Sequence, residues 1–437
     1  MIRSVGTAAL FVGVMLLSSA QPAAAQSASP DDTARFLAGM PPSSGSPLVA
    51  LTQDPIWQQH ARYFNSAFGN LDKNQLAKIR AWSNAKLTAP RPVLFYMFSG
   101  PDFLYANAFF PQASTYVMAG LEPVGPIPDV LRLPRGAVGD GLRHIERSLG
   151  TILTISFFKT HDMRMELGVN RFSGTLPLLY VFLARSGKTI REVSLIKLDD
   201  QGLPQPENAP PSPGMRNPAH GVRIAFTDNE GREQTLYYFG TNIANDGFKA
   251  SGFAKFCNRL GVGDAFVKSA SYLLHSGGFS DVRNFLLQHS VEILQDDTGV
   301  PVSYFNQDRW QLRPFGRYTG PINMFAKNYQ PRLTQLFQQG HAEPLNFGLG
   351  YQWRVLGSNL LLATRVDANA PDAQVSTQPP IDWSPQARAG DKAIASAGAD
   401  DAGAQPKKSS TRTTAKNQRA RGYDGRPAPF FWPFFRF

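Results

Sequence analysis

Two apolar stripes at helical spacing open the structured part of the chain. The first begins at Asp54-Pro55, where an acidic N-cap precedes a proline at the first helical position, a typical helix start. A second helix is predicted over residues 73–86. The apolar residues of the first stripe recur every three or four positions and are Trp57, Ala61, Phe64 and Phe68. We therefore expect a pair of helices ahead of the sheet.

From Pro92 the pattern changes to short apolar runs, rich in β-branched and aromatic residues, that end at turn residues and are typical of strands. Residues 176–184 suit either a helix or a strand. The proline-rich stretch between Asp199 and His220 is predicted to be an irregular surface loop, because proline removes a backbone donor and fixes φ. The predicted strands are 93–98, 115–120, 153–158, 192–198, 222–226 and 235–239.

After Gly247 the apolar spacing becomes helical again. Asp264 is expected to cap one helix and Ser280 to start the next, so that the two form a hairpin around Gly277-Gly278. A further helix over 322–339 should be bent or interrupted at Pro331. Two strand-like runs, 350–356 and 359–364, end the periodic part of the sequence.

These elements predict an α+β fold. We expect a single globular domain over residues 51–365, with a mixed β-sheet packed by helices and an N-terminal helical pair. Residues 26–50 are rich in Ser, Pro, Gly and Ala and are expected to be a flexible linker, with one or two helical turns at 31–37. Residues 366–437 lack periodicity and are predicted to be a disordered basic tail.

The first residues have the pattern of a secretory signal peptide. Arg3 precedes an apolar run that is too short to span a bilayer, and Ala23-Ala24-Ala25 supplies a small-residue cleavage site. We expect residues 1–25 to be removed and the mature chain to be periplasmic or secreted. A bacterial lipoprotein would need a cysteine at the cleavage site, where this chain has Gln26. No other apolar run is long enough to predict a transmembrane helix.

Residues 407–437 carry +7 of the net charge of +11. Because this charge lies at the end of a tail, which is the weakest place for specific readout, nucleic-acid binding is not expected. The tail ends in an aromatic motif that could contact a membrane surface or another cell-envelope component, pack back onto its own domain, or have no role. The candidate contact residues are Phe430, Phe431, Trp432, Phe434, Phe435 and Phe437.

Only one cysteine, Cys257, is present, so the folded chain cannot contain an internal disulfide. Its surroundings predict a helix and a buried, unreactive thiol. The histidines and acidic residues show no metal-ligand spacing, and no phosphate-binding loop occurs. We therefore expect no metal and no cofactor. The block 309–318 alternates cations with aromatics and suits an irregular surface strand better than a site that stacks on sugar rings or bases.

Polar residues follow several predicted strands and provide the candidate site. If those strands share an orientation, their carboxyl ends would bring these residues to one edge of the sheet, where ligand clefts form in α/β sheets. Caps and turns are the alternative role for the same residues. For an enzyme, Ser99 is the candidate nucleophile, His161 the base, and Asp102 or Asp162 the residue that orients it. For a binding protein, the candidate ligand contacts are Glu122, Asp162 and Asn242.

No motif identifies a reaction, and G-x-S-x-G is absent. The sequence therefore favours an exported, envelope-associated protein that binds a small ligand or a partner and is not catalytic. The alternative is an exported hydrolase that uses a cleft at the strand ends.

Overall fold

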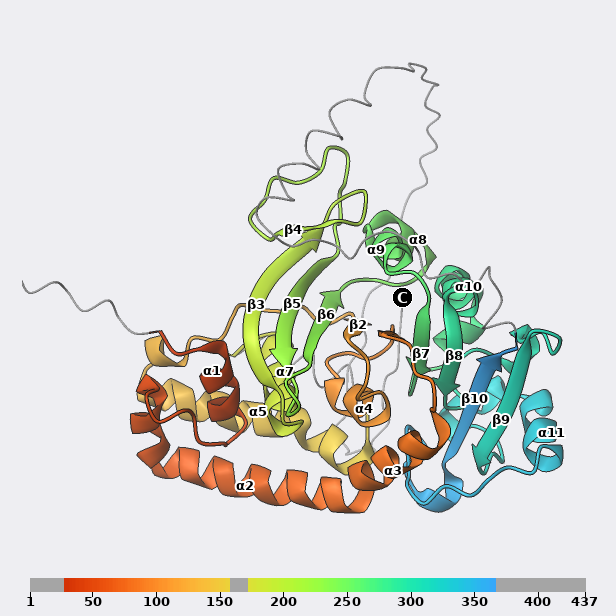
Figure 1. The fold of residues 1–437 in the computed structure, drawn as a ribbon, viewed down its shortest axis with the longest axis horizontal. Coiled ribbons are helices and arrows are strands. Elements are labelled where there is room, and N and C mark those ends of the chain that lie inside the picture. Colours follow the sequence, from red (N-terminus) through yellow and green to blue (C-terminus); the bar gives the residue numbers. More distant parts are fainter. Residues whose placement is uncertain (1–26, 158–171, 367–437) are drawn as a thin grey trace, which may run out of the picture. The chain divides into compact units, whose positions relative to one another are not determined.

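The computed structural model of the 437-residue chain describes residues 27–157 and 172–366. Within them, ten strands form one sheet in the order β4-β3-β5-β6-β2-β1-β7-β8-β10-β9 (Figure 1). The strands are β1 Val93–Tyr96, β2 Thr115–Gly120, β3 Thr189–Leu198, β4 Pro204–Pro206, β5 His220–Thr227, β6 Glu233–Gly240, β7 Gly263–Val267, β8 Ser290–Gln295, β9 Trp310–Gly316 and β10 Asn359–Arg365.

Helices precede, separate and follow these strands. The α-helices are α1 Pro30–Leu37, α2 Pro55–Leu71, α3 Ala77–Lys86, α4 Phe103–Phe109, α5 Arg135–Ile155, α7 Leu176–Arg185, α8 Asn245–Ala250, α9 Phe253–Arg259, α10 Ser280–His289 and α11 Pro331–Gln339. The short helices are η1 Pro47–Gln53, η2 Asp72–Leu76, η3 Val130–Arg132, η4 Leu273–His275, η5 Gly277–Phe279, η6 Val302–Tyr304, η7 Asn323–Asn328 and η8 Val355–Gly357.

The five central strands, β6, β2, β1, β7 and β8, run parallel, and the outer strands on each side are antiparallel to their neighbours. The carboxyl ends of the parallel strands therefore meet at one edge of the sheet, which we call the carboxyl edge. It consists of the residues that follow these strands, namely 97–102, 121–126, 241–243, 268–272 and 296–299.

Alternate residues of the central strands enter two apolar layers. In β1, Leu94 and Tyr96 join the core shared with helices α1 to α5 and α7, whereas Phe95 faces the opposite side and packs edge-on against Phe285 of α10, with ring centroids 5.1 Å apart. Helices α8, α9 and α10 lie together beside the sheet in Figure 1. The sheet is therefore covered on both faces, as its parallel centre requires. The predicted α+β class with a mixed sheet is confirmed.

The N-terminal helices form as predicted, but they are continuous. Asp54 caps α2 by accepting a hydrogen bond from the backbone N–H of Ile56 at 2.8 Å. Helix α2 then passes into α3 through a π-helical turn, η2, with no intervening loop. Helix α1 confirms the helical turns expected at 31–37, but the segment around them, expected to be a flexible linker, packs against the domain. Phe36 and Leu37 are fully buried there, and the Trp57 indole N–H donates to the Phe36 carbonyl at 3.0 Å.

Two predicted elements have the wrong secondary structure. The β-branched run at 153–158 was predicted as a strand, but its first residues belong to α5, because an apolar stripe through Leu149 and Ile152 extends the helix to Ile155. The helix predicted from Asp264 is instead strand β7, which is buried on both faces and so lacks the alternation that marks a strand. Asp264 is not a cap; its carboxylate accepts the backbone N–H groups of Arg91 and Glu292.

Smaller differences follow from local chemistry. The ambiguous segment 176–184 forms the buried helix α7. The proline-rich loop contains β4, which tolerates proline because it is an edge strand. Pro331 starts α11 as its first residue, so the predicted long helix is divided into η7 and α11. Residues 350–356 contain no strand, whereas 359–364 form most of β10.

Two further predictions concern cysteine and membrane spans. Cys257 is buried in α9 as expected, and burial raises the pKa of its thiol well above the ordinary value. In the ranges 27–157 and 172–366, no helix is both long and apolar enough to cross a membrane. The predicted signal peptide and basic tail lie outside the described residues.

Candidate functional site

Four of the residues singled out in the sequence, Ser99, Asp102, Glu122 and Asn242, lie at the carboxyl edge. Strands β1, β2 and β6 are parallel neighbours, so the shared orientation on which this prediction depended is present. His161 and Asp162 lie outside the described residues. The question is then which of the four side chains are available for chemistry.

Ser99 is buried and engaged with the backbone. Its Oγ donates to the carbonyl of Gly100 at 2.6 Å and lies 3.3 Å from the carbonyl of Ala119. The backbone N–H groups of Ser99 and Gly100 also donate to Ala119. These bonds tie the end of β1 to the end of β2. In this geometry the hydroxyl stabilises a turn. Its hydrogen bonds to described residues are made with backbone carbonyls and not with a general base.

Asp102 caps α4 and forms a buried ion pair. Its Oδ1 accepts the backbone N–H of Tyr105 at 3.2 Å, and its Oδ2 accepts the Tyr96 hydroxyl at 2.9 Å. The same Oδ2 lies 2.7 Å from the Nζ of Lys268, and both side chains are only 2% exposed. Lys268 also donates to the carbonyl of Ser156 and lies over the ring of Tyr105, 4.0 Å from its centroid.

Burial disfavours both charges of this pair. It raises the pKa of Asp102 above the ordinary value, against the lowering influence of Lys268. It lowers the pKa of Lys268, against the raising influence of Asp102. The ammonium group has three donors, and Asp102, Ser156 and the Tyr105 ring surround it, so the pair is internally satisfied. Such an arrangement can hold the ends of β1 and β7 together.

A second buried polar cluster follows β8. Asp296 accepts the backbone N–H of Ser269 at 2.8 Å and both the N–H and hydroxyl of Thr298. Asp297 accepts the Tyr272 hydroxyl and the Asn359 amide. Burial, with the neighbouring carboxyl of Asp297 as the second cause, raises the pKa of Asp296 to about 7. The pKa of Asp297 is raised by burial as well.

The loop between β7 and η4 has a strained backbone. Ser269, Ser271 and Tyr272 have positive φ angles of 54°, 51° and 57°, a conformation that residues other than glycine rarely adopt. The hydroxyl of Tyr351 holds this loop, since it pairs with Ser271 Oγ at 2.7 Å and donates to the Ser269 carbonyl at 3.1 Å. The polar cluster and Tyr351 therefore fix a loop that would otherwise relax.

A hollow of about 440 Å³ opens at the carboxyl edge beside β2 and β6. Its polar groups are His220 and Glu207, which form an ion pair of 2.8 Å when the histidine is protonated, and both are about half exposed. Most of the remaining lining is apolar or backbone. The lining residues are Pro123, Val124, Gly125, Pro126, Leu195, Glu207, His220, Gly221 and Gly240.

Glu122 and Asn242 lie next to this hollow without lining it. Glu122 is buried, immediately precedes Pro123 in the wall, and its backbone carbonyl accepts the Tyr238 hydroxyl at 2.9 Å. The side chain of Asn242 accepts the backbone N–H of Ala244 at 3.0 Å, which is a turn-forming contact. Of the predicted ligand contacts, one is therefore part of the support of the hollow and one forms a turn.

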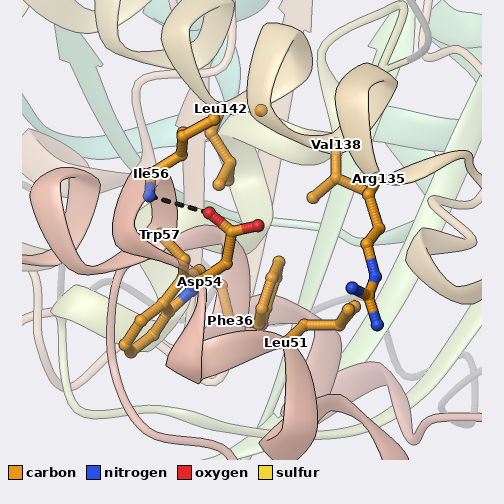
Figure 2. Close-up of a pocket in the computed structure, with 9 residues that line it drawn as sticks. Phe36, Leu51, Asp54, Ile56, Trp57, Arg135, Val138 and Leu142 are labelled. Carbon is orange, nitrogen blue, oxygen red and sulfur yellow. Dashed lines mark hydrogen bonds between the residues drawn. The ribbon is translucent and has the colours of Figure 1, made fainter.

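A smaller cavity lies between η1, α2 and α5. Figure 2 shows its apolar wall of Phe36, Trp57 and Leu142, with the Asp54 carboxylate turned to the Ile56 N–H. The cavity has a volume of about 20 Å³, which is room for about one water molecule. It is a packing defect between helices and too small for a ligand.

Sequence reasoning missed Lys268, Asp296 and the hollow. Lys268 directly follows the apolar run of β7, and Asp296 directly follows that of β8. A charged residue at the end of an apolar run is the sequence signal that could have identified them. Within the described residues, no group of three or more His, Cys, Asp or Glu side chains could hold a metal ion. Comparisons with protein-family models, with curated proteins and with solved structures give no match for this chain.

Proposed function

We propose that this chain is an exported protein that binds a small ligand in the hollow at the carboxyl edge and is not catalytic. The observation that carries the proposal is the volume of about 440 Å³, which falls within the range of small-molecule pockets. The mainly apolar lining and the single polar pair, Glu207 and His220, suit a largely apolar ligand with one or two hydrogen-bonding groups. The export part of the proposal rests on the signal-peptide pattern of residues 1–25.

The buried side chains of Ser99 and Asp102 already have hydrogen-bond or ion-pair partners within the protein, and this supports binding over catalysis. Ser99 donates to two backbone carbonyls, and Asp102 is committed to Lys268, Tyr96 and a helix N-terminus. A nucleophile needs a base within hydrogen-bond reach, and the described contacts of Ser99 supply none. The hydrolase alternative therefore depends on His161.

The binding proposal is tested by filling the hollow. Native mass spectrometry of the purified full chain would reveal a ligand retained from the host, and a thermal-shift screen of small apolar compounds would supply one otherwise. Leu195→Trp adds bulk to the hollow and should abolish the ligand mass or the thermal shift. The matched control is Leu131→Trp on η3, whose leucine is outside the lining and partly exposed. Equal ligand retention in both variants would contradict the proposal.

The same preparation tests the hydrolase alternative. A screen of esterase, peptidase and glycosidase substrates should give no turnover. Turnover that disappears in Ser99→Ala while folding is retained would replace the binding proposal with the hydrolase.

We also propose that the basic aromatic tail contacts the cell envelope. The charge of +7 on residues 407–437 and the terminal aromatic residues provide electrostatic attraction and interfacial insertion together. Removal of residues 367–437 should lower the share of the protein that is found in the membrane fraction of host cells. An unchanged distribution would count against this role of the tail.

A further inference from the structure

A short apolar segment of the folded part is exposed to solvent just before β10. Residues 353–356, which we call the apolar tip, are Trp353, Arg354, Val355 and Leu356, and all four are exposed. Leu356 has 86% of its side chain exposed, the largest value among the exposed large apolar residues of the described ranges. A monomeric protein rarely leaves neighbouring large apolar side chains in water without a partner.

A second segment extends this surface. Helix η7 exposes Met324, 52% accessible, and Lys327. It lies against the base of the tip, because the rings of Phe325 and Tyr351 are 5.2 Å apart. The amide of Gln352 also donates to the Gly320 carbonyl at 2.8 Å, which joins the chain before η7 to the chain before the tip.

The charge of these two segments is uniformly positive. Residues 317–330 and 351–358 contain three cations, Arg317, Lys327 and Arg354, and no Asp or Glu. All three cations are exposed. Arg354 lies over the ring of Trp353, 5.3 Å from its centroid, so a cation and an aromatic ring are presented together. Exposed apolar side chains flanked by cations are the combination that binds the interface of an anionic membrane.

We propose that the apolar tip and η7 dock on an anionic lipid surface. Charge disfavours two other occupants of this surface. A second copy would bring the same three cations against them, and residues 407–437, which include the aromatic end of this chain, carry +7, so like charges oppose both. Anionic headgroups attract the cations while Trp353, Val355 and Leu356 enter the interface. This inference is independent of the hollow and of the tail.

The test is a reporter of insertion at the tip. Cys257 is buried, so Leu356→Cys in the full chain can be labelled at one position with a polarity-sensitive fluorophore. Vesicles of phosphatidylglycerol and phosphatidylcholine should raise its fluorescence and shift it to the blue, and spin-labelled lipid should quench it. Vesicles of phosphatidylcholine alone should have little effect. The matched reporter is Leu121→Cys, whose leucine is 52% exposed but lies after β2.

Binding measurements provide the second arm. Trp353→Ser with Leu356→Ser should weaken co-sedimentation with anionic vesicles about tenfold or more, whereas Leu121→Ser with Ile127→Ser should leave it within about twofold. Lys327→Gln with Arg354→Gln should also weaken it about tenfold, and only when the vesicles are anionic. The inference would be overturned if the labelled Leu356→Cys chain co-sediments with vesicles but its fluorescence does not change. The tail alone would then account for binding. Equal losses in the two serine variants would overturn it as well.

Discussion

The buried pair of Lys268 and Asp102 makes a quantitative prediction about stability. Lys268→Met keeps an unbranched apolar stem over the Tyr105 ring but removes the ammonium group that lies 2.7 Å from Asp102. Asp102 then remains in a site that is 2% exposed, with the Tyr96 hydroxyl and the Tyr105 N–H as donors. Removing one partner of a buried pair costs about 3–5 kcal/mol, so we expect the free energy of unfolding to fall by that amount.

The reciprocal variant isolates the charge on the other partner. Asp102→Asn retains an oxygen that can cap α4, as asparagine does well at N-cap positions, but leaves Lys268 without a counter-charge. Its cost should again be about 3–5 kcal/mol. The double variant contains neither charge, so it should be more stable than the sum of the single costs predicts, by about 1–3 kcal/mol.

Urea unfolding followed by far-ultraviolet circular dichroism gives the free energy of unfolding of the wild type, the two single variants and the double variant. Lys249→Met is the matched control, since Lys249 also pairs with an aspartate, Asp281, at 2.8 Å but is 69% exposed. It should change the free energy of unfolding by about 1 kcal/mol or less. The reasoning that this ion pair is shielded from water would be refuted by either of two results. One is a cost for Lys268→Met no larger than that of the control, and the other is strict additivity of the two single costs.

Three further predictions follow. Burial raises the pKa of Asp264 from 3.8 to about 7, so the unfolded chain releases this proton at a lower pH than the folded chain, and the stabilising contribution of the protonated group is lost as pH rises from about 4 to about 7. The cost of Asp264→Asn, measured by chemical unfolding, should therefore shrink by about 3 kcal/mol between pH 5 and pH 8, and a cost that grows would contradict this reasoning. Phe36→Ala should destabilise by about 3–5 kcal/mol in the same assay because the ring is fully buried, whereas a flexible linker would show no change. Deleting residues 370–437 should leave the melting temperature unchanged, and a loss of several degrees would mean that the aromatic end packs on the domain.

Local sequence pattern predicted strands β2, β5 and β6 well because these strands have local signals. β2 was predicted with its observed bounds, and β5 and β6 each begin two residues before the predicted run and end one residue after it. Their apolar runs contain β-branched and aromatic residues and stop at turn residues. The order of strands along the carboxyl edge was not predictable, because the neighbours β1 and β7 are far apart in sequence and pair only through tertiary contacts.

The error at β7 also concealed part of the candidate site. A central parallel strand is apolar on both faces, and Ala265, Phe266 and Val267 fit a helix as well as a strand. With a helix assigned there, Lys268 falls within it and attracts no notice. With a strand assigned, Lys268 becomes the first residue at the carboxyl edge, where it meets Asp102. Assigning a helix in place of strand β7 therefore left Lys268 out of the predicted site.

The buried polar groups of the carboxyl edge have a structural use that does not require catalysis. Asp296 holds the N–H of Ser269, and Tyr351 holds Ser269 and Ser271, so together they stabilise a loop with three positive φ angles. Tyr351 is also the base of the apolar tip, two residues before Trp353. The network thus fixes the position of the tip before any lipid is present. A surface that is already ordered loses less conformational entropy on docking. The buried carboxylate of Asp296 and the hydroxyl of Tyr351 therefore assist docking by ordering the chain that leads into the apolar tip.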